Sequence, residues 1–111
     1  GREGNDLLIG GTGGLADVLS GDAGNDLLVG SGTTNDASST AGDANDTALM
    51  ALLVSWSSTH GAGLLSAIVG PDDGVNDSLT GSTGDDDFYA TATDLLSDFN
   101  APSVGSDRRF P

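Results

Sequence analysis

The residues best suited to chemistry in this chain are aspartates that recur beside glycines. Sixteen of the seventeen acidic residues are Asp, and the only Glu is Glu3. A merely solvated acidic surface would mix Glu with Asp. Short carboxylates next to glycine turns suit a hard cation such as calcium, which takes carboxylate and carbonyl oxygens as ligands. The composition therefore favours metal binding within turns.

Five of the aspartates, one in each copy of a repeated pattern, have Leu or Phe two positions after them. The fullest form is Gly-x-x-Gly-Asn-Asp-Leu-Leu followed by an apolar residue. Three near-complete copies cover Gly1–Ile9, Gly21–Val29 and Gly81–Tyr89. One copy with a two-residue insertion covers Gly10–Ser20, and one half-copy covers Asp77–Thr80. Ordinary turns do not require an apolar residue at this fixed distance, so the spacing indicates a structural repeat.

This nonapeptide resembles the calcium-binding repeat of RTX (repeats-in-toxin) proteins. The resemblance covers about 50 of the 111 residues, with Arg2, Asp22 and Ser82 at the second position, where the pattern prefers Gly. It implies an all-β fold, a parallel β-roll or short right-handed solenoid, in which six residues form a turn and three form a strand. It also implies calcium between stacked turns, and a C-terminal segment of a larger secreted bacterial protein.

Carried over residue by residue, the resemblance implies metal ligands at the sixth-position aspartates and at the turn carbonyls. The candidate ligands are Asp6, Asp17, Asp26, Asp77 and Asp86, with the carbonyls near Gly4, Gly13, Gly24 and Gly84. Because the chain alternates between two sides, every second turn should stack, which pairs Asp6 with Asp26, Asp26 with Asp86, and Asp17 with Asp77. The eighth position should point inward, which places Leu8, Leu19, Leu28, Leu79 and Phe88 in the core.

The elements that must position these turns are interrupted by a helical insertion. Four apolar residues at helical spacing predict one buried helical face: Leu49, Leu52, Leu53 and Trp56. An N-cap is expected at Asn45-Asp46-Thr47, a helix end near Gly61 and Gly63, and a second short helix over Leu64–Val69. The predicted organisation is repeats over 1–32, a helical insertion over 33–71, repeats over 72–90 and a capping tail over 91–111.

The helix has two candidate roles. The outward positions of one side of the repeat are apolar, namely Leu7, Ile9, Leu27 and Val29. We expect the helix to cover this face through Leu49, Leu53 and Trp56, because exposed apolar patches are costly in water. The alternative is a helix that binds a protein partner.

The composition excludes several classes of function. A net charge of −14, with three Arg and no Lys, disfavours contact with nucleic acid or anionic lipid. No apolar run approaches the roughly 20 residues of a membrane span. With His60 as the only His and no Cys, the chain offers neither a zinc site nor a Cys-His pair. We therefore expect no enzyme activity.

The expected function is that of a calcium-binding RTX repeat module that folds on calcium binding outside the cell. Such a module would serve as a structural or secretion-assisting segment of a larger protein, located in the medium or at the cell surface. Other interpretations remain open: an acidic disordered spacer, an adhesion or partner-binding module of unknown partner, and an accessory segment of a secreted hydrolase or protease.

Overall fold

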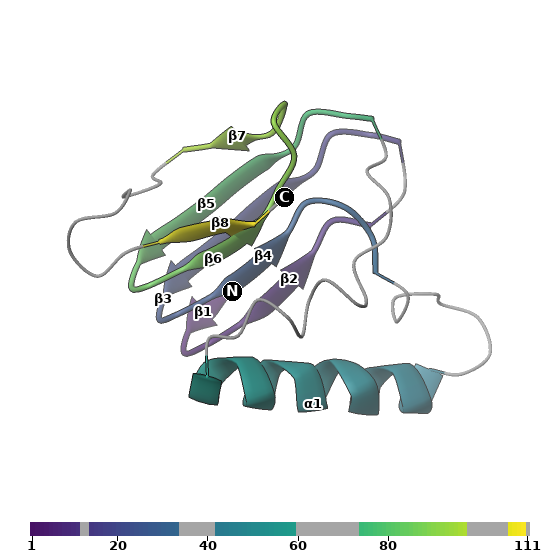
Figure 1. Cartoon of the computed structure of the whole chain (residues 1–111), viewed down its shortest axis with the longest axis vertical. Helices are drawn as coiled ribbons and strands as arrows, with labels where there is room; N and C mark the ends of the chain where they lie inside the picture. The colour runs from purple at the N-terminus through teal and green to yellow at the C-terminus, as the bar shows by residue number, and fades with distance from the viewer. Residues whose placement is uncertain (12–13, 34–41, 60–73, 98–106, 111) are drawn as a thin grey trace.

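In the part of the chain that the structure describes, the strands form two parallel sheets, and a helix packs against one of them (Figure 1). The computed structural model describes residues 1–11, 14–33, 42–59, 74–97 and 107–110. In chain order the elements are β1 (Arg2–Glu3), β2 (Leu7–Ile9), β3 (Val18–Ala23), β4 (Leu27–Val29), α1 (Gly42–Thr59), β5 (Ser78–Thr83), β6 (Asp87–Tyr89), β7 (Leu95–Leu96) and β8 (Arg108–Phe110).

Successive strands alternate between the two sheets. One sheet has the order β1-β3-β5-β7 and the other the order β2-β4-β6-β8. All pairings are parallel, and the nonapeptides stack in register: Leu8 pairs with Leu28, and Leu28 with Phe88. The expectation of parallel sheets with an inserted helix is confirmed. Below, one turn together with the short strand that follows it is called a rung.

The inner core lies between the sheets and contains the eighth residue of each repeat. Leu28, Leu79, Phe88 and Ala90 are buried there, and Leu8, Leu19 and Leu96 pack against them. Successive side chains of a strand point to opposite faces. One inward residue per three-residue strand therefore suffices to fill this space, and the predicted inward positions are confirmed.

Helix α1 lies within the stretch predicted as an insertion and packs on the outer face of the β2-β4-β6-β8 sheet. Trp56 and Leu52 are buried against Leu27, and the partly buried residues around them are Leu7, Leu53 and Tyr89. The indole Nε1 of Trp56 donates a hydrogen bond of 2.5 Å to Oδ2 of Asp87. The expected role of the helix as a cover for the apolar outer face is confirmed.

The start of α1 corrects one prediction. The helix begins at Gly42, so the N-cap expected at Asn45-Asp46-Thr47 is wrong. The expected helix end at Gly61 and Gly63 and the second helix over Leu64–Val69 lie outside the described residues.

Among the described residues, no helix is long and apolar enough to cross a membrane.

The C-terminal tail adds one strand to each sheet. In one sheet Ser78 of β5 pairs with Leu95 of β7, and in the other Asp87 of β6 pairs with Arg108 of β8. The segment predicted as a capping tail therefore continues the stack of rungs. This matters for the candidate site, because β7 and β8 each follow an Asp.

Candidate metal centre

The turns stack closely at the fourth-position glycines. Gly4, Gly24 and Gly84 have φ values of 121°, 142° and 143°, a region that side chains rarely adopt. A Cβ added to Gly24 would overlap the carbonyl oxygen of Gly4, and one added to Gly84 would overlap that of Gly24. Carbonyl oxygens of these turns therefore lie directly against the neighbouring turn.

The second position of the turns shows that the departures from the pattern are tolerated. Asp22 and Ser82 adopt left-handed conformations with φ of 76° and 80° although neither is Gly. The Asp22 side chain accepts a hydrogen bond from the Ser20 hydroxyl at 2.9 Å. Asp is better suited than most residues to positive φ, so Asp22 holds its turn without Gly.

On one side of the stack, the sixth-position aspartates form a continuous hydrogen-bonded series, the first ladder. The amide of Asp6 donates to Oδ1 of Asp26 at 2.9 Å, and the amide of Asp26 donates to Oδ1 of Asp86 at 2.8 Å. The amide of Asp86 then donates to Oδ1 of Asp107 at 3.1 Å. The predicted neighbours Asp6, Asp26 and Asp86 are thus brought together.

A second ladder occupies the other side. The amide of Asp17 donates to Oδ1 of Asp77 at 2.8 Å, and the amide of Asp77 donates to Oδ1 of Asp94 at 3.0 Å. The predicted neighbours Asp17 and Asp77 are therefore together as well, despite the irregular repeats around them. The Oδ2 atom of Asp94 also accepts hydrogen bonds from the amide and hydroxyl of Thr91 at 2.7 and 3.2 Å.

Sequence reasoning missed Asp94 and Asp107 as members of the ladders. Asp94 could have been found, because Asp94-Leu95-Leu96 carries the same spacing of Asp and Leu as the other copies. Arg109 stands two positions after Asp107, where the pattern has Leu or Phe. No signal in the sequence could have placed Asp107 in the first ladder.

The second carboxylate oxygens are the chemically unusual atoms of the ladders. The Oδ2 atoms of Asp17 and Asp26 are buried and have no hydrogen-bond partner among the described residues. Asp26 is fully buried, so its carboxylate has lost the water that would solvate it. A buried charge without compensation is costly, and such groups are normally paired or bound to metal.

Electrostatics at Asp26 agree with this geometry. Burial raises the pKa of the Asp26 carboxyl above its ordinary value of 3.8, and the negative charges of Asp6 and Asp22 raise it further. The hydrogen bond that involves Asp6 and the charge of the N-terminus oppose the rise in this pKa. The fold therefore holds a carboxylate that a nearby cation would stabilise.

The first-position glycines leave space in front of these carboxylates. A Cβ added to Gly10 would lie 2.5 Å from the carbonyl oxygen of Gly30 and 2.8 Å from Oδ2 of Asp17. A Cβ added to Gly1 would likewise meet the Gly21 carbonyl oxygen and Oδ2 of Asp6. In each case a carboxylate oxygen and a backbone carbonyl of a neighbouring turn converge where a side chain is missing.

The residues present fit a hard cation that takes its ligands from both backbone and side chains. Among the described residues, no cluster of three or more His, Cys, Asp or Glu side chains could hold a metal. A metal here would therefore need carbonyl oxygens in addition to Asp, a donor set that calcium accepts and zinc does not. The carbonyls of Gly21 and Gly30 were not among the predicted ligands. The predicted carbonyl near Gly13 lies outside the described residues.

Comparisons with known proteins identify no relative: no family model, no curated protein and no solved structure matches this chain.

Proposed function

We propose that this chain is a calcium-binding module of the RTX type, with the two sheets as a β-roll and calcium held between stacked turns. The observation that supports it best is the pair of aspartate ladders, in which Asp17 and Asp26 present buried Oδ2 atoms without a hydrogen-bond partner. Calcium would supply the positive charge that compensates these buried carboxylate oxygens. The proposed ligands are the Oδ2 atoms of the ladders and the carbonyl oxygens that face them.

The proposed activity is coupled folding and binding. Without calcium the stacked aspartates repel one another across a chain of net charge −14, and the rungs separate. With calcium the turns are neutralised, the strands stack, and the column of Leu8, Leu28 and Phe88 becomes buried. The free energy of binding thus becomes free energy of folding.

Such a switch suits a protein that leaves the cell. An exported chain that stays unfolded where calcium is scarce can fold where calcium is plentiful. We therefore propose a secreted or cell-surface location and a structural or secretion-assisting role, without enzyme activity in this segment. An adhesion module remains the second candidate, because α1 presents the exposed apolar residue Met50 beside an apolar groove.

The test is a calcium titration of the full chain followed by far-UV circular dichroism, with magnesium as the control ion. We expect a cooperative gain of β signal with calcium and little with magnesium, which keeps its water and demands octahedral geometry. Trp56 gives a second signal, since its emission should shift to shorter wavelength as it becomes buried. A spectrum already folded in chelator and unchanged by calcium would contradict the proposal.

A further inference from the structure

The two aspartate ladders are built from the same backbone joint. In each of them, the residue directly after an Asp, the seventh position of the repeat, donates its amide to the carbonyl oxygen of the Asp in the preceding turn. These bonds measure 2.8 Å, and their donors are Leu27 and Asp87 in the first ladder and Ser78 and Leu95 in the second. The seventh positions therefore hold the backbone of one ladder Asp against the next.

The two ladders differ in what covers their seventh positions. In the first ladder, Leu27 and Asp87 are 0% and 1% exposed, and α1 packs against both of them. In the second ladder, Val18 and Leu95 are 80% and 62% exposed. Ser78, which pairs with both of these residues, is only partly buried. The chain thus contains the same joint with a helical cover and without one.

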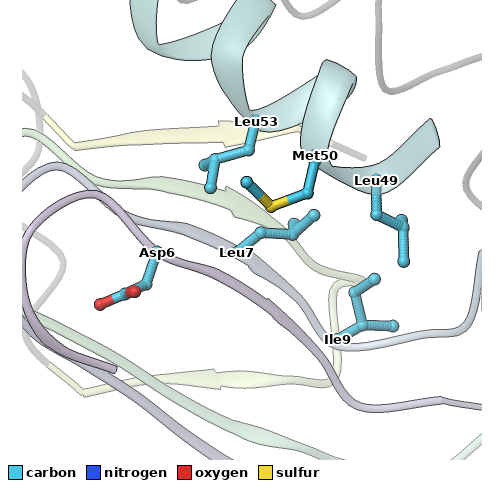
Figure 2. Close-up of a pocket in the computed structure, with 6 residues that line it drawn as sticks. All are labelled: Asp6, Leu7, Ile9, Leu49, Met50 and Leu53. Atoms are coloured by element: carbon cyan, nitrogen blue, oxygen red, sulfur yellow. The ribbon is translucent and has the colours of Figure 1, made fainter. Parts of the chain in front are cut away.

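Helix α1 contacts successive rungs of the first ladder. Trp56 packs against Leu27 of β4 and donates its indole hydrogen bond to Asp87 of β6. Leu7 of β2 packs against the same cluster. Figure 2 shows the β2 end of this interface, where Leu7 points toward α1 and the neighbouring Asp6 points away from it. The helix therefore touches β2, β4 and β6 one residue after their ladder aspartates.

We propose that α1 positions the first ladder for calcium, so that this ladder binds the ion more tightly than the second. The helix interface needs β2, β4 and β6 in their stacked arrangement, so its free energy adds to that of calcium at the first ladder alone. Leu52 and Trp56, the buried residues of α1 in this interface, are the positioning residues. This inference rests on the proposed function, because it assigns different affinities to two ladders that are both proposed to bind calcium.

The coupling between helix and ladder works in both directions. If docking of α1 strengthens calcium binding at the first ladder, calcium there strengthens the docking of α1 by the same factor. The emission of Trp56, which is buried only in the docked helix, should therefore follow the first ladder. Asp26→Asn should raise the calcium midpoint of this emission more than Asp17→Asn does. A larger rise with Asp17→Asn would overturn the inference.

The decisive test is a titration of the full chain by two-dimensional NMR, with free calcium set by a chelator. The amides of the seventh positions report on each ladder separately, Leu27 and Asp87 on the first and Ser78 and Leu95 on the second. In the parent chain, the amides of the first ladder should reach their calcium-bound positions at lower free calcium. Equal midpoints for the two ladders, or a lower midpoint for the second, would overturn the inference.

A change within α1 should act on one ladder only. Leu52→Ala removes a buried contact of the helix and alters neither ladder, so it should raise the calcium midpoint of the first ladder about tenfold and that of the second much less. Val54→Ala is the matched control, since Val54 is 61% exposed on the same helix, and it should leave both midpoints nearly unchanged. If Leu52→Ala does not fold, Trp56→Phe, which loses the hydrogen bond to Asp87, should raise the same midpoint.

A variant of the inner core separates positioning from a general loss of stability. Leu79 is buried in the core between the two sheets, so Leu79→Ala should raise both midpoints together. If Leu52→Ala also raises both midpoints equally, α1 stabilises the whole stack, and the inference is overturned while calcium binding stands. Amide signals that respond to calcium in neither ladder would contradict the proposed function and, with it, the inference.

Discussion

Asp26 lies inside the first ladder, and its buried carboxylate is the group at which the proposed calcium site can be tested most directly. Its Oδ1 accepts from Asp6, its amide donates to Asp86, and its Oδ2 has no hydrogen-bond partner among the described residues. An amide in place of the carboxylate would keep the first contact and remove the charge. The effect of that substitution should therefore depend on calcium.

We predict that Asp26→Asn destabilises the calcium-bound fold and stabilises the metal-free fold. With calcium, the loss of a charged ligand should cost about 3–5 kcal/mol, as expected when one partner of a buried charge pair is removed. In chelator, removal of a desolvated carboxylate should be favourable. Thermal unfolding in both conditions checks this, with Asp22→Asn as the control at an exposed acid. A loss of stability in both conditions would show that Asp26 acts only in packing.

Acid should partly replace calcium. The pKa of Asp26 is raised by burial above the ordinary 3.8 that it would have in the unfolded chain. The fold therefore binds this proton more tightly than the unfolded chain does, and the resulting stability is complete below pH 3.8 and lost as pH rises through the raised pKa. In chelator, β signal should increase as pH is lowered toward that value. The Asp26→Asn variant should show a smaller increase.

At the scale of the elements, the interface of α1 combines apolar contacts with the hydrogen bond from Trp56 to Asp87. Asp87 stands in the column of Leu7 and Leu27, yet it is buried and accepts the Trp56 hydrogen bond. The docking of the helix thus includes a buried polar contact between Trp56 and Asp87 in addition to its apolar contacts.

We predict that Trp56→Phe costs about 1–3 kcal/mol of the free energy of unfolding, because it removes a donor from the buried Asp87. Trp56→Ala should cost more, about 3–5 kcal/mol, because a cavity is added. The double variant Trp56→Phe with Asp87→Leu should recover much of the loss of the first, since Leu continues an apolar column. Urea unfolding in calcium gives these values as a double-mutant cycle. Additive losses would mean that the pair is not coupled.

The stacking of turns can be tested at a single glycine. Gly24→Ala combines positive φ with an overlap against Gly4 O, whereas Gly14→Ala has positive φ alone, with open space around it. The strain at Gly14 should cost about 1–2 kcal/mol. Gly24→Ala should cost clearly more, and should weaken calcium binding because it separates neighbouring turns. Calcium titrations give the affinity of each variant. An equal loss of calcium affinity in the two variants would count against a role of close turn stacking in binding.

Sequence periodicity was enough to predict the rungs of the five recognised repeats and the inward positions of the core, because both depend on local spacing. The Leu or Phe two residues after each Asp must point inward once a three-residue strand follows a turn. The helix was predicted as a cover from Leu49, Leu53 and Trp56, but its start at Gly42 was not, because apolar spacing does not mark a polar first turn. The last rung was missed, because Arg109 replaces the apolar signal and only the pairing of β8 with β6 places Asp107.

For the whole molecule, calcium removal should appear as a change in size. The folded chain has a radius of gyration of 13.0 Å, whereas an unfolded chain of this length is expected to reach about 34 Å. Small-angle X-ray scattering at low protein concentration should therefore show a more than twofold expansion in chelator. A radius that stays near the folded value without calcium would mean that the helix and the inner core suffice to hold the rungs together.

The alternation of strands between two sheets also has a mechanical consequence. The first strands and the last strands lie at opposite edges of the stack, and the hydrogen bonds between rungs run along the line that joins those edges. Tension applied between the two ends would therefore load one interface between rungs at a time, in an unzipping geometry, and not all interfaces together in shear. Yielding should begin at the outer rungs and pause where α1 bridges β2, β4 and β6.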